Sequence, residues 1–292
     1  MPPKAPQPPL RRNCGTMPAH MMLLEKHPEF RARQFKLEEQ TAKLRSTLKV
    51  SALKQKIVKV VVNVVYKTAA QNIPDAQIKS QIVALNKDFG ATNPDKSKVP
   101  APWKGLVTDT RIRFKLAKIT RTQTTKNGFI HDDGVKKAST GGIAPFNPAT
   151  HLNFWVCALD GGLLGYAQFP GGPLHTDGVV INYQAFGTKG TATAPFNKGR
   201  TATHEVGHYF NLRHIWGDTE DCSGSDMVAD TPNAAGPNFN KPTFPSVSCN
   251  NGPNGDMFMN YMDYVDDAAM FMFTTQQIAR MRAALQGPRK TL

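Results

Sequence analysis

The segment 204-HEVGHYFNLRH-214 restricts the fold of this 292-residue chain more than any other stretch. His204 and His208 are four residues apart, so on a helix they project from one face, one above the other. His214 is six residues further on, and a continued helix would turn it about 240° away and move it about 9 Å along the axis. The three imidazoles can meet only if the helix ends before His214. Asn211 lies where the chain must turn, and asparagine is the best residue after glycine at positive φ.

Three imidazole nitrogens that meet can fill three tetrahedral positions around Zn²⁺ and leave the fourth open, as in a catalytic zinc site. Glu205, next to the first histidine, is placed to act as general base on a water molecule at the metal. His-Glu-x-x-His alone arises by chance in about one chain per hundred, so alone it is a weak to moderate signal, and the alternative is an ordinary helix with surface histidines. The third histidine lowers that chance by about fortyfold. We therefore predict His204, His208 and His214 as zinc ligands and Glu205 as a catalytic residue.

The remaining sequence predicts an α/β domain preceded by a basic helical segment. Residues 1–10 are rich in proline and are expected to be disordered. Between about 217 and 256 the chain is rich in Gly, Pro, Asn and Asp, and irregular chain of that length is usually functional or held by bonds. Helices are expected within 18–54, 72–90, 200–211 and 274–286, and strands at 57–66, 111–119, 151–159, 163–169 and 177–187.

Charge and hydropathy narrow the class of protein. The longest apolar run, 57–66, is interrupted by Lys59 and Asn63, so no segment is long enough to span a membrane. The net charge is +14; residues 1–56 hold 12 Lys/Arg against 4 Asp/Glu, and the rest holds 24 against 18. The basic segment lacks interleaved aromatic residues for base stacking, which favours a solvated, removable segment over a nucleic-acid-binding one. The N-terminus has no apolar stretch typical of a signal peptide, so the route of export stays open.

Further motifs point to one family. HEVGHYFNLRH resembles the HExxHxxGxxH signature of metzincin metallopeptidases, with Asn211 at the usual glycine, and 260-NYMDY-264 resembles their Met-turn. Together with LLGYAQFPGG and CSGSDMVADTP, nearly the whole chain from about residue 55 resembles the pappalysin family. The resemblance implies an α/β (α+β) zincin-like metzincin fold: a twisted mixed sheet, with the active-site helix above an irregular C-terminal subdomain that ends in a helix. It also implies a secreted zinc endopeptidase, often with calcium sites.

The resemblance supplies roles for individual residues. Glu205 would polarise the attacking water and transfer its proton, and Tyr264 would hydrogen-bond the tetrahedral intermediate. Tyr264 could instead be a buried aromatic residue near a turn, whereas Met262 packs beneath the metal on either interpretation. The edge strand would pair with an extended substrate through its backbone, which aligns a peptide without reading its sequence; its residues are Leu163, Leu164, Gly165 and Tyr166.

Cys14, in RRNCGT, matches the cysteine that holds some family members latent by occupying the open zinc position. Residues 1–55 would then be a latency pro-segment, removed by cleavage within 45–56. The catalytic domain would be 56–292, with an upper subdomain 56–214 and a lower subdomain 215–292. The alternative is an unpaired terminal cysteine without a role.

The other cysteines have structural interpretations. Cys222 and Cys249 bracket the irregular segment 223–248, and closing such a loop contributes about 3–4 kcal/mol. The resembling family often has a second disulfide that overlaps the one between Cys222 and Cys249. Its cysteines would fall near Lys241 and at Ala269, and this chain has no cysteine there. The loop 223–248 is therefore expected to be held less firmly. Cys157, in an apolar strand, is expected to be a buried thiol.

Metal is a second candidate for stabilising this loop. Asp226, Asp230 and the carbonyl groups of Val228 and Thr231 are plausible oxygen ligands for structural Ca²⁺. The alternative is a solvated acidic loop.

Acidic residues after the Met-turn suggest a substrate preference. Asp263, Asp266 and Asp267 cluster where the wall of the pocket beyond the scissile bond would lie. A carboxylate there, of Asp266 or Asp267, would favour Arg or Lys directly after the cut. Equally, these carboxylates could cap the turn or bind backbone amides.

The sequence therefore favours a zymogen of a zinc endopeptidase acting on proteins or peptides, with no nucleic-acid or membrane partner. One alternative is a catalytically silent metal-binding protein of the same fold that acts as a binding module; the intact Glu205 and three histidines argue against it. The oligomeric state and the physiological substrate stay open.

Overall fold

The computed structural model describes residues 11–47 and 52–292. The predicted disorder of residues 1–10 and part of the predicted cleavage region, residues 48–51, lie outside the described residues. None of the described helices is both long and apolar enough to cross a membrane.

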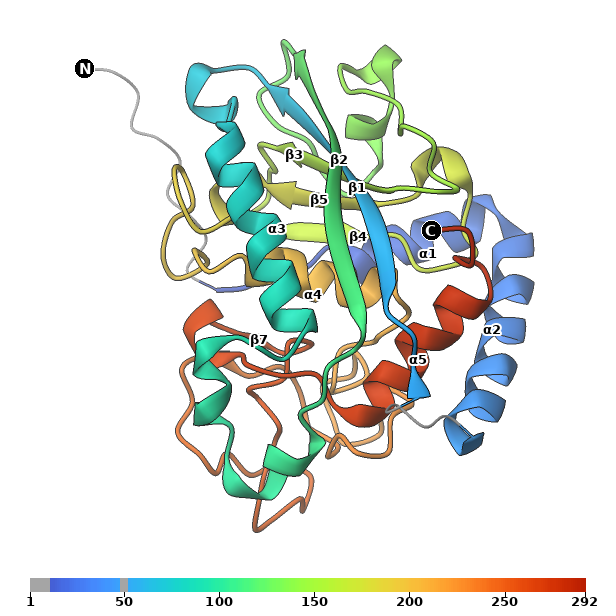
Figure 1. The fold of residues 1–292 in the computed structure, drawn as a ribbon, viewed down its shortest axis with the longest axis vertical. Helices are drawn as coiled ribbons and strands as arrows, with labels where there is room; N and C mark the ends of the chain where they lie inside the picture. Colours follow the sequence, from blue (N-terminus) through green and yellow to red (C-terminus); the bar gives the residue numbers. More distant parts are fainter. Residues whose placement is uncertain (1–10, 48–51) are drawn as a thin grey trace.

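A five-stranded sheet in the order β2-β1-β3-β5-β4 forms the upper half of the molecule (Figure 1). Neighbouring strands run parallel except β4, which is antiparallel to β5. β4 therefore forms one edge of the sheet and β2 the other. The strand bounds are β1 Lys56–Tyr66, β2 Ile112–Gln123, β3 Leu152–Cys157, β4 Gly165–Ala167 and β5 Val179–Asn182.

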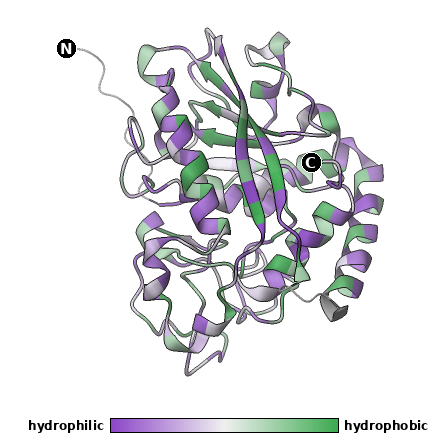
Figure 2. Cartoon of the chain, viewed as in Figure 1, coloured by the Kyte–Doolittle hydropathy of each residue, from purple (hydrophilic) through white to green (hydrophobic). Residues whose placement is uncertain are grey.

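Helices α3 (Asp75–Phe89) and α4 (Arg200–Tyr209) pack against the sheet and bury its apolar residues. Val58 and Val60 of β1 and Phe154 of β3 are fully buried in this core. Figure 2 shows hydrophilic and hydrophobic residues alternating along the two long strands β1 and β2, whereas the shorter inner strands are mostly hydrophobic. A strand that is covered on both sides reads as a continuous apolar run, which explains the sequence of β3.

The lower half follows α4 and is largely irregular. A short parallel pair, β6 (Phe239–Asn240) with β7 (Tyr264–Val265), connects its loop to the segment below α4. The last helix, α5 (Thr275–Gln286), begins with a capping box in which Thr274 and Gln277 satisfy each other's backbone amides. The structure thus has the predicted arrangement of an active-site helix above an irregular region that ends in a helix.

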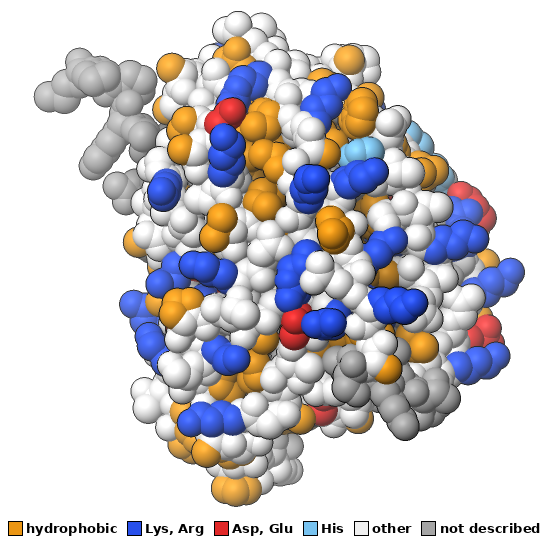
Figure 3. Space-filling model, viewed as in Figure 1, with side chains coloured by type: hydrophobic (Ala, Val, Ile, Leu, Met, Phe, Trp, Pro, Cys, Tyr) orange, Lys and Arg blue, Asp and Glu red, His pale blue; other side chains and the backbone are white. Residues whose placement is uncertain are grey.

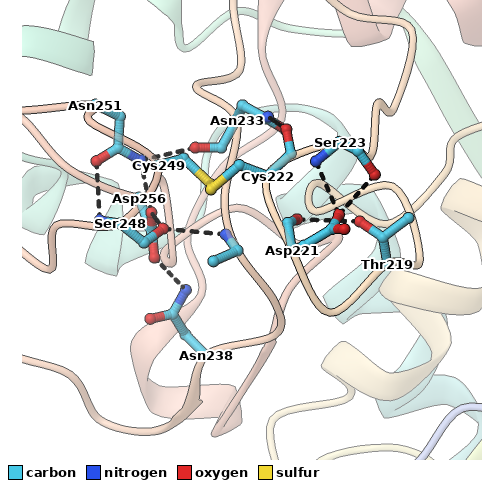
Figure 4. Close-up of a disulfide and its surroundings, with 11 residues drawn as sticks. Thr219, Asp221, Cys222, Ser223, Asn233, Asn238, Ser248, Cys249, Asn251 and Asp256 are labelled. Atoms are coloured by element: carbon cyan, nitrogen blue, oxygen red, sulfur yellow. Dashed lines mark hydrogen bonds between the residues drawn. A yellow bond between two sulfur atoms is a disulfide. The ribbon is translucent and has the colours of Figure 1, made fainter.

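The disulfide Cys222–Cys249 closes the irregular loop. Beside it, the buried Asp256 accepts hydrogen bonds from Ser248, Asn251 and Asn238 (Figure 4). A polar network thus accompanies the disulfide in a chain whose sequence lacks the second disulfide of the family.

The N-terminal segment forms two helices, α1 (Thr16–Lys26) and α2 (Pro28–Thr47), as predicted. α1 lies against β4, and α2 lies alongside α5 (Figure 1). Phe30 and Leu37 of α2 are buried, so the segment packs on the domain through an apolar face.

The surface of the molecule is basic on the face drawn in Figure 3, where Lys and Arg side chains outnumber those of Asp and Glu.

Candidate active site

Helix α4 carries the first two histidines and ends at Tyr209. Asn211 follows with φ of 76°, in the left-handed region, and the chain turns back so that His214 faces His204 and His208. The sequence prediction of a turn at Asn211 is confirmed. The three imidazole Nε2 atoms lie 3.1–3.3 Å from one another, and all three side chains are buried.

This triangle of nitrogens fits a zinc ion. Tetrahedral ligands at a Zn–N distance of about 2.0–2.1 Å are separated by about 3.3–3.4 Å, close to the spacing here. Cys14 supplies a fourth donor, since its Sγ and the three histidine nitrogens all lie within 4.8 Å of one another. Cysteine and histidine are the donors that zinc prefers. Among the described residues, this is the one group of three or more His, Cys, Asp or Glu that could hold a metal.

The other ring nitrogen of each histidine has a fixed partner. His204 Nδ1 lies 2.7 Å from the carbonyl oxygen of Tyr261, and His208 Nδ1 lies 2.7 Å from that of Leu212. His214 Nδ1 lies 2.5 Å from the carboxylate of Asp218. Each of these oxygens accepts a hydrogen bond from Nδ1–H, which keeps the proton of the neutral ring on Nδ1. Each Nε2 therefore carries a free lone pair that faces the centre of the triangle.

Burial sets the protonation of the site. It lowers the pKa of His204 and His208 well below the usual value, so both rings are neutral, as metal ligands must be. It also raises the pKa of Glu205 to about 7, against the hydrogen bonds from Thr16 and Cys14 that favour the carboxylate. A carboxyl group with a pKa near neutral pH suits general base catalysis.

Met262 and Tyr264 lie below and beside the histidines. A Cβ atom on Gly207 would lie 2.4 Å from Met262 Sδ, so the glycine of α4 lets this methionine approach the helix. The ring of Tyr264 lies 4.9 Å from that of His214, measured between centroids. Burial, with the charges of Cys14 and Glu205, raises the pKa of Tyr264 well above its usual value, so its hydroxyl group stays a hydrogen-bond donor.

The N-terminal segment runs through the site next to β4. Leu164 N donates to the carbonyl oxygen of Asn13, and Gly15 N donates to that of Gly165, so the segment pairs with the sheet edge in parallel around Cys14. Of the predicted substrate-binding residues, Leu164 and Gly165 therefore contact this extended chain through their backbone. Leu163 and Tyr166 instead pack in a small core cluster with Trp155.

Glu205 is engaged by the same segment. Thr16 Oγ1 donates to Glu205 Oε2 at 2.8 Å, and Cys14 Sγ lies 3.4 Å from the same oxygen. Burial and the charge of Glu205 raise the pKa of the Cys14 thiol well above its usual value. The segment thus covers the metal-facing side of the triangle and the carboxylate together.

Arg12 occupies a buried pocket beside the histidines. Its guanidinium group lies 2.7 Å from the carboxylate of Asp267, and it also donates to Thr201 Oγ1 and to the carbonyl oxygen of Val265. Asp267 is fully buried and accepts two further bonds from the backbone amides of Lys198 and Arg200.

The other two carboxylates of the predicted pocket behave differently. Asp263 accepts bonds from the backbone amides of Asn238 and Tyr264, which is the alternative role that the sequence left open. Asp266 precedes the short helical turn Asp267–Ala269, and none of the described residues forms an ion pair with it.

The predicted calcium ligands lie close together at the start of α5. The carboxylate of Asp226 accepts bonds from Val228 N and Thr231 Oγ1, and that of Asp230 accepts from Thr274 Oγ1 and Gln276 N. No ion pair to Asp226 is present among residues 11–47 and 52–292, and burial raises its pKa to about 7. The charge of Arg280 acts against this rise, and both carboxylate oxygens of Asp226 already accept a hydrogen bond.

Sequence reasoning missed Arg12, Thr16 and Asp218, which contact site residues. Arg12 and Thr16 each lie two residues from Cys14 in RRNCGT, and this closeness to the predicted zinc ligand is the one feature of the sequence that points to them. Asp218 lies four residues after His214, a spacing that suggests contact on a helix but not in a turn. Cys157 is buried with a raised pKa, as predicted.

Comparison with known proteins identifies relatives. The family described as pregnancy-associated plasma protein-A, peptidase family M43, matches residues 145–286. An extracellular metalloprotease of Arthroderma otae is 34% identical over 224 residues, which cover 74% of this chain and 72% of the relative. One from Pyricularia oryzae is 32% identical and covers 73% and 68% of the two chains.

Two solved structures are also similar. Mature mirolysin of Tannerella forsythia in complex with a cleaved peptide is 47% identical with a TM-score of 0.80, and the match covers 82% of this chain and 96% of mirolysin. A promirolysin mutant from the same organism is 43% identical with a TM-score of 0.86, and the match covers 96% of both chains. The chain therefore belongs to peptidase family M43, the pappalysins, and is a metzincin metalloendopeptidase.

Proposed function

We propose that this chain is the zymogen of a secreted zinc endopeptidase, with residues 1–55 as pro-segment and 56–292 as catalytic domain. The observation that carries the proposal is the triangle of three buried histidine nitrogens beside Glu205, with Cys14 as the fourth donor. Secretion is supported by the names of the relatives, which are extracellular metalloproteases.

His204, His208 and His214 would hold the zinc ion, and Cys14 would complete the site in the latent form. When bound, the ion supplies Lewis acidity toward water and the peptide carbonyl group. Glu205 takes the proton of the attacking water and delivers it to the leaving amine. Tyr264, whose hydroxyl group stays protonated, donates a hydrogen bond to the oxyanion.

The substrate would extend along the edge of the sheet. Leu164 N and Gly165 O are the backbone groups that now pair with residues 13–15, which run parallel to β4. An extended peptide would bond to the same edge once the pro-segment leaves, and it would run in the opposite direction, so that its residue after the cut reaches Asp267. The cleaved peptide bound by mature mirolysin supports a peptide as ligand.

Asp267 would select Arg or Lys directly after the scissile bond. Its carboxylate is fully buried and already binds a guanidinium group, that of Arg12, at 2.7 Å. Charge-assisted pairs of this kind discriminate strongly, because a neutral side chain would leave the buried carboxylate unpaired. Asp266, the preceding residue in the chain, would add to the negative potential.

Latency would follow from the same contacts. Cys14 occupies the fourth position of the zinc site, Thr16 binds Glu205, and Arg12 fills the pocket at Asp267. Cleavage within 45–56 would separate the pro-segment from the domain. Asp226, Asp230 and the carbonyl groups of Val228 and Thr231 would bind Ca²⁺ and stabilise the lower half.

The test compares the full chain with its Glu205→Ala variant, before and after removal of the pro-segment, on a proteome-derived peptide mixture. New termini are read by mass spectrometry. We expect cleavage by the activated wild type alone, with Arg or Lys after each cut, and earlier zinc-dependent cleavage by a Cys14→Ala variant. Silence of the activated wild type would favour a metal-binding module instead.

A further inference from the structure

Arg11 lies over the aromatic ring of Phe239, next to the pocket that Arg12 fills. The Arg11 guanidinium carbon is 5.0 Å from the centroid of this ring. This distance is within the range of cation–π attraction, which extends to about 6 Å. Among the described residues no carboxylate forms an ion pair with Arg11, so the ring face is the partner of this cation.

The position of Phe239 is fixed relative to the candidate active site. Phe239 belongs to β6, which pairs with β7 at Tyr264. The rings of Phe239 and Tyr264 lie 6.0 Å apart between centroids, and Tyr264 in turn contacts His214. The half-buried Phe239 therefore lies beside the candidate active site, in contact with Tyr264.

The position of the pro-segment indicates where the side chains of an extended peptide would lie beside β4. Two backbone hydrogen bonds to β4 flank Cys14, and Arg12 and Arg11 are the second and third residues before it. Successive side chains of an extended chain point to opposite sides. Arg12 enters the buried pocket at Asp267, whereas Arg11, at a bend in the chain, is exposed and lies over the ring of Phe239.

We propose that Phe239 forms a second binding subsite, for a cationic side chain that directly follows the Arg or Lys held by Asp267. The inference rests on the proposed function, in which the first residue after the cut enters the Asp267 pocket. The next residue of such a substrate lies further from the histidines, where the structure has Arg11. Substrates with two consecutive basic residues after the scissile bond are then cleaved faster than those with one.

The experiment uses the full chain after proteolytic activation. Peptides keep Arg directly after the cut and carry Arg, Lys, Leu, Ala or Glu at the next position, and kcat/KM is measured for each. We expect Arg and Lys to exceed Leu and Ala by about two- to fivefold, the range of an exposed cation–π contact. Phe239→Leu should abolish this ratio, and Phe239→Trp should keep or raise it.

Two controls separate the possible failures. The ratio of kcat/KM between the peptides with Arg and with Ala at the second position is taken within each variant, so any general effect of Phe239→Leu on the nearby Tyr264 cancels. The inference would be overturned if the wild type had equal kcat/KM for all residues at the second position after the cut, or if Phe239→Leu kept the preference for Arg and Lys there. Either result would leave cleavage before Arg unaffected. A matched peptide with Ala in place of the Arg directly after the cut tests the first position, and an unchanged kcat/KM for that peptide would instead refute the pocket at Asp267.

Discussion

Single residues behind the histidines determine how well the triangle is preorganised. Asp218 contacts His214 Nδ1 and is the one side chain among the three Nδ1 partners. We predict that Asp218→Asn lowers zinc affinity by about 10- to 100-fold, the usual effect of losing such a partner. Competition with a chromogenic chelator measures it. The nearby exposed Asp221, which bonds only Thr219 and Ser223, gives the matched control Asp221→Asn; equal losses in both variants would contradict the role of Asp218.

Gly207 is a second residue with a specific steric role. An alanine Cβ there would lie 2.4 Å from Met262 Sδ, so we predict that Gly207→Ala destabilises the protein by about 1–3 kcal/mol despite better helix propensity. Denaturant unfolding measures this change. Gly236→Ala, where nothing lies within 4 Å, is the control. Adding Met262→Ala should recover part of the loss from Gly207→Ala; strictly additive losses would argue against a direct clash.

The sequence predicted the metal ligands and the catalytic carboxylate better than the residues that hold them in position. His204, His208, His214 and Glu205 form a local pattern in which helix period and one turn residue fix the geometry. Arg12 and Asp267 are 255 residues apart, and no local rule joins them. The partners of the histidine Nδ1 atoms are mostly backbone carbonyl groups, which every residue carries and no motif can mark.

At the scale of elements, the contact between α2 and α5 ties the pro-segment to the turn after α4. Arg280 of α5 is buried and donates to the carbonyl oxygen of Asn211, and its remaining donors form a two-bond pair with Glu38 of α2. Glu38 also accepts from the side chain of Asn211. The pro-segment is thereby anchored at a point remote from Cys14.

We predict that Glu38→Gln weakens docking of the pro-segment and speeds activation of the full chain severalfold, because the buried Arg280 loses its charged partner. The readout is the rate at which activity appears under a fixed amount of activating protease. Glu29→Gln removes an exposed pair with Arg33 in the same helix and should leave this rate unchanged. Equal activation of the two variants would contradict the prediction.

The elements themselves were mostly predictable, but their order in the sheet was not. Val-rich β1 and apolar β3 read as strands because both are buried in the sheet. The edge strand β4 has only three residues, Gly165–Ala167, and its antiparallel pairing with β5 depends on contacts that the local pattern does not encode. β2 extends to Gln123, beyond the predicted end at 119, because β1 pairs with it along its full length.

At the scale of the whole molecule, we predict that Ca²⁺ stabilises the fold more at pH 8 than at pH 5.5. Burial raises the pKa of Asp226 to about 7, so this residue's contribution to stability is present at low pH and is lost as pH rises through that value. A bound cation would restore it. At 100 times the Kd, Ca²⁺ should add about 2.7 kcal/mol, or about 5–10 °C in Tm.

Thermal unfolding with and without a chelator that spares zinc measures this difference. Asp226→Asn should abolish the effect of Ca²⁺ on Tm, and with it the difference in that effect between pH 8 and pH 5.5. An unchanged Tm after removal of calcium at pH 8 would show that no calcium ion stabilises the loop near Asp226.

The ion pair between Arg12 and Asp267 also limits how such a protein can evolve. If one carboxylate both chooses the substrate and receives the N-terminal segment, specificity and latency are inherited through the same residue. A substitution that reversed the charge at position 267 would change the preference and, in the same step, remove one of the contacts that hold the N-terminal segment in the site. Divergence to new substrates would then proceed through paired changes at positions 12 and 267, with the pro-segment changing first or together with the pocket.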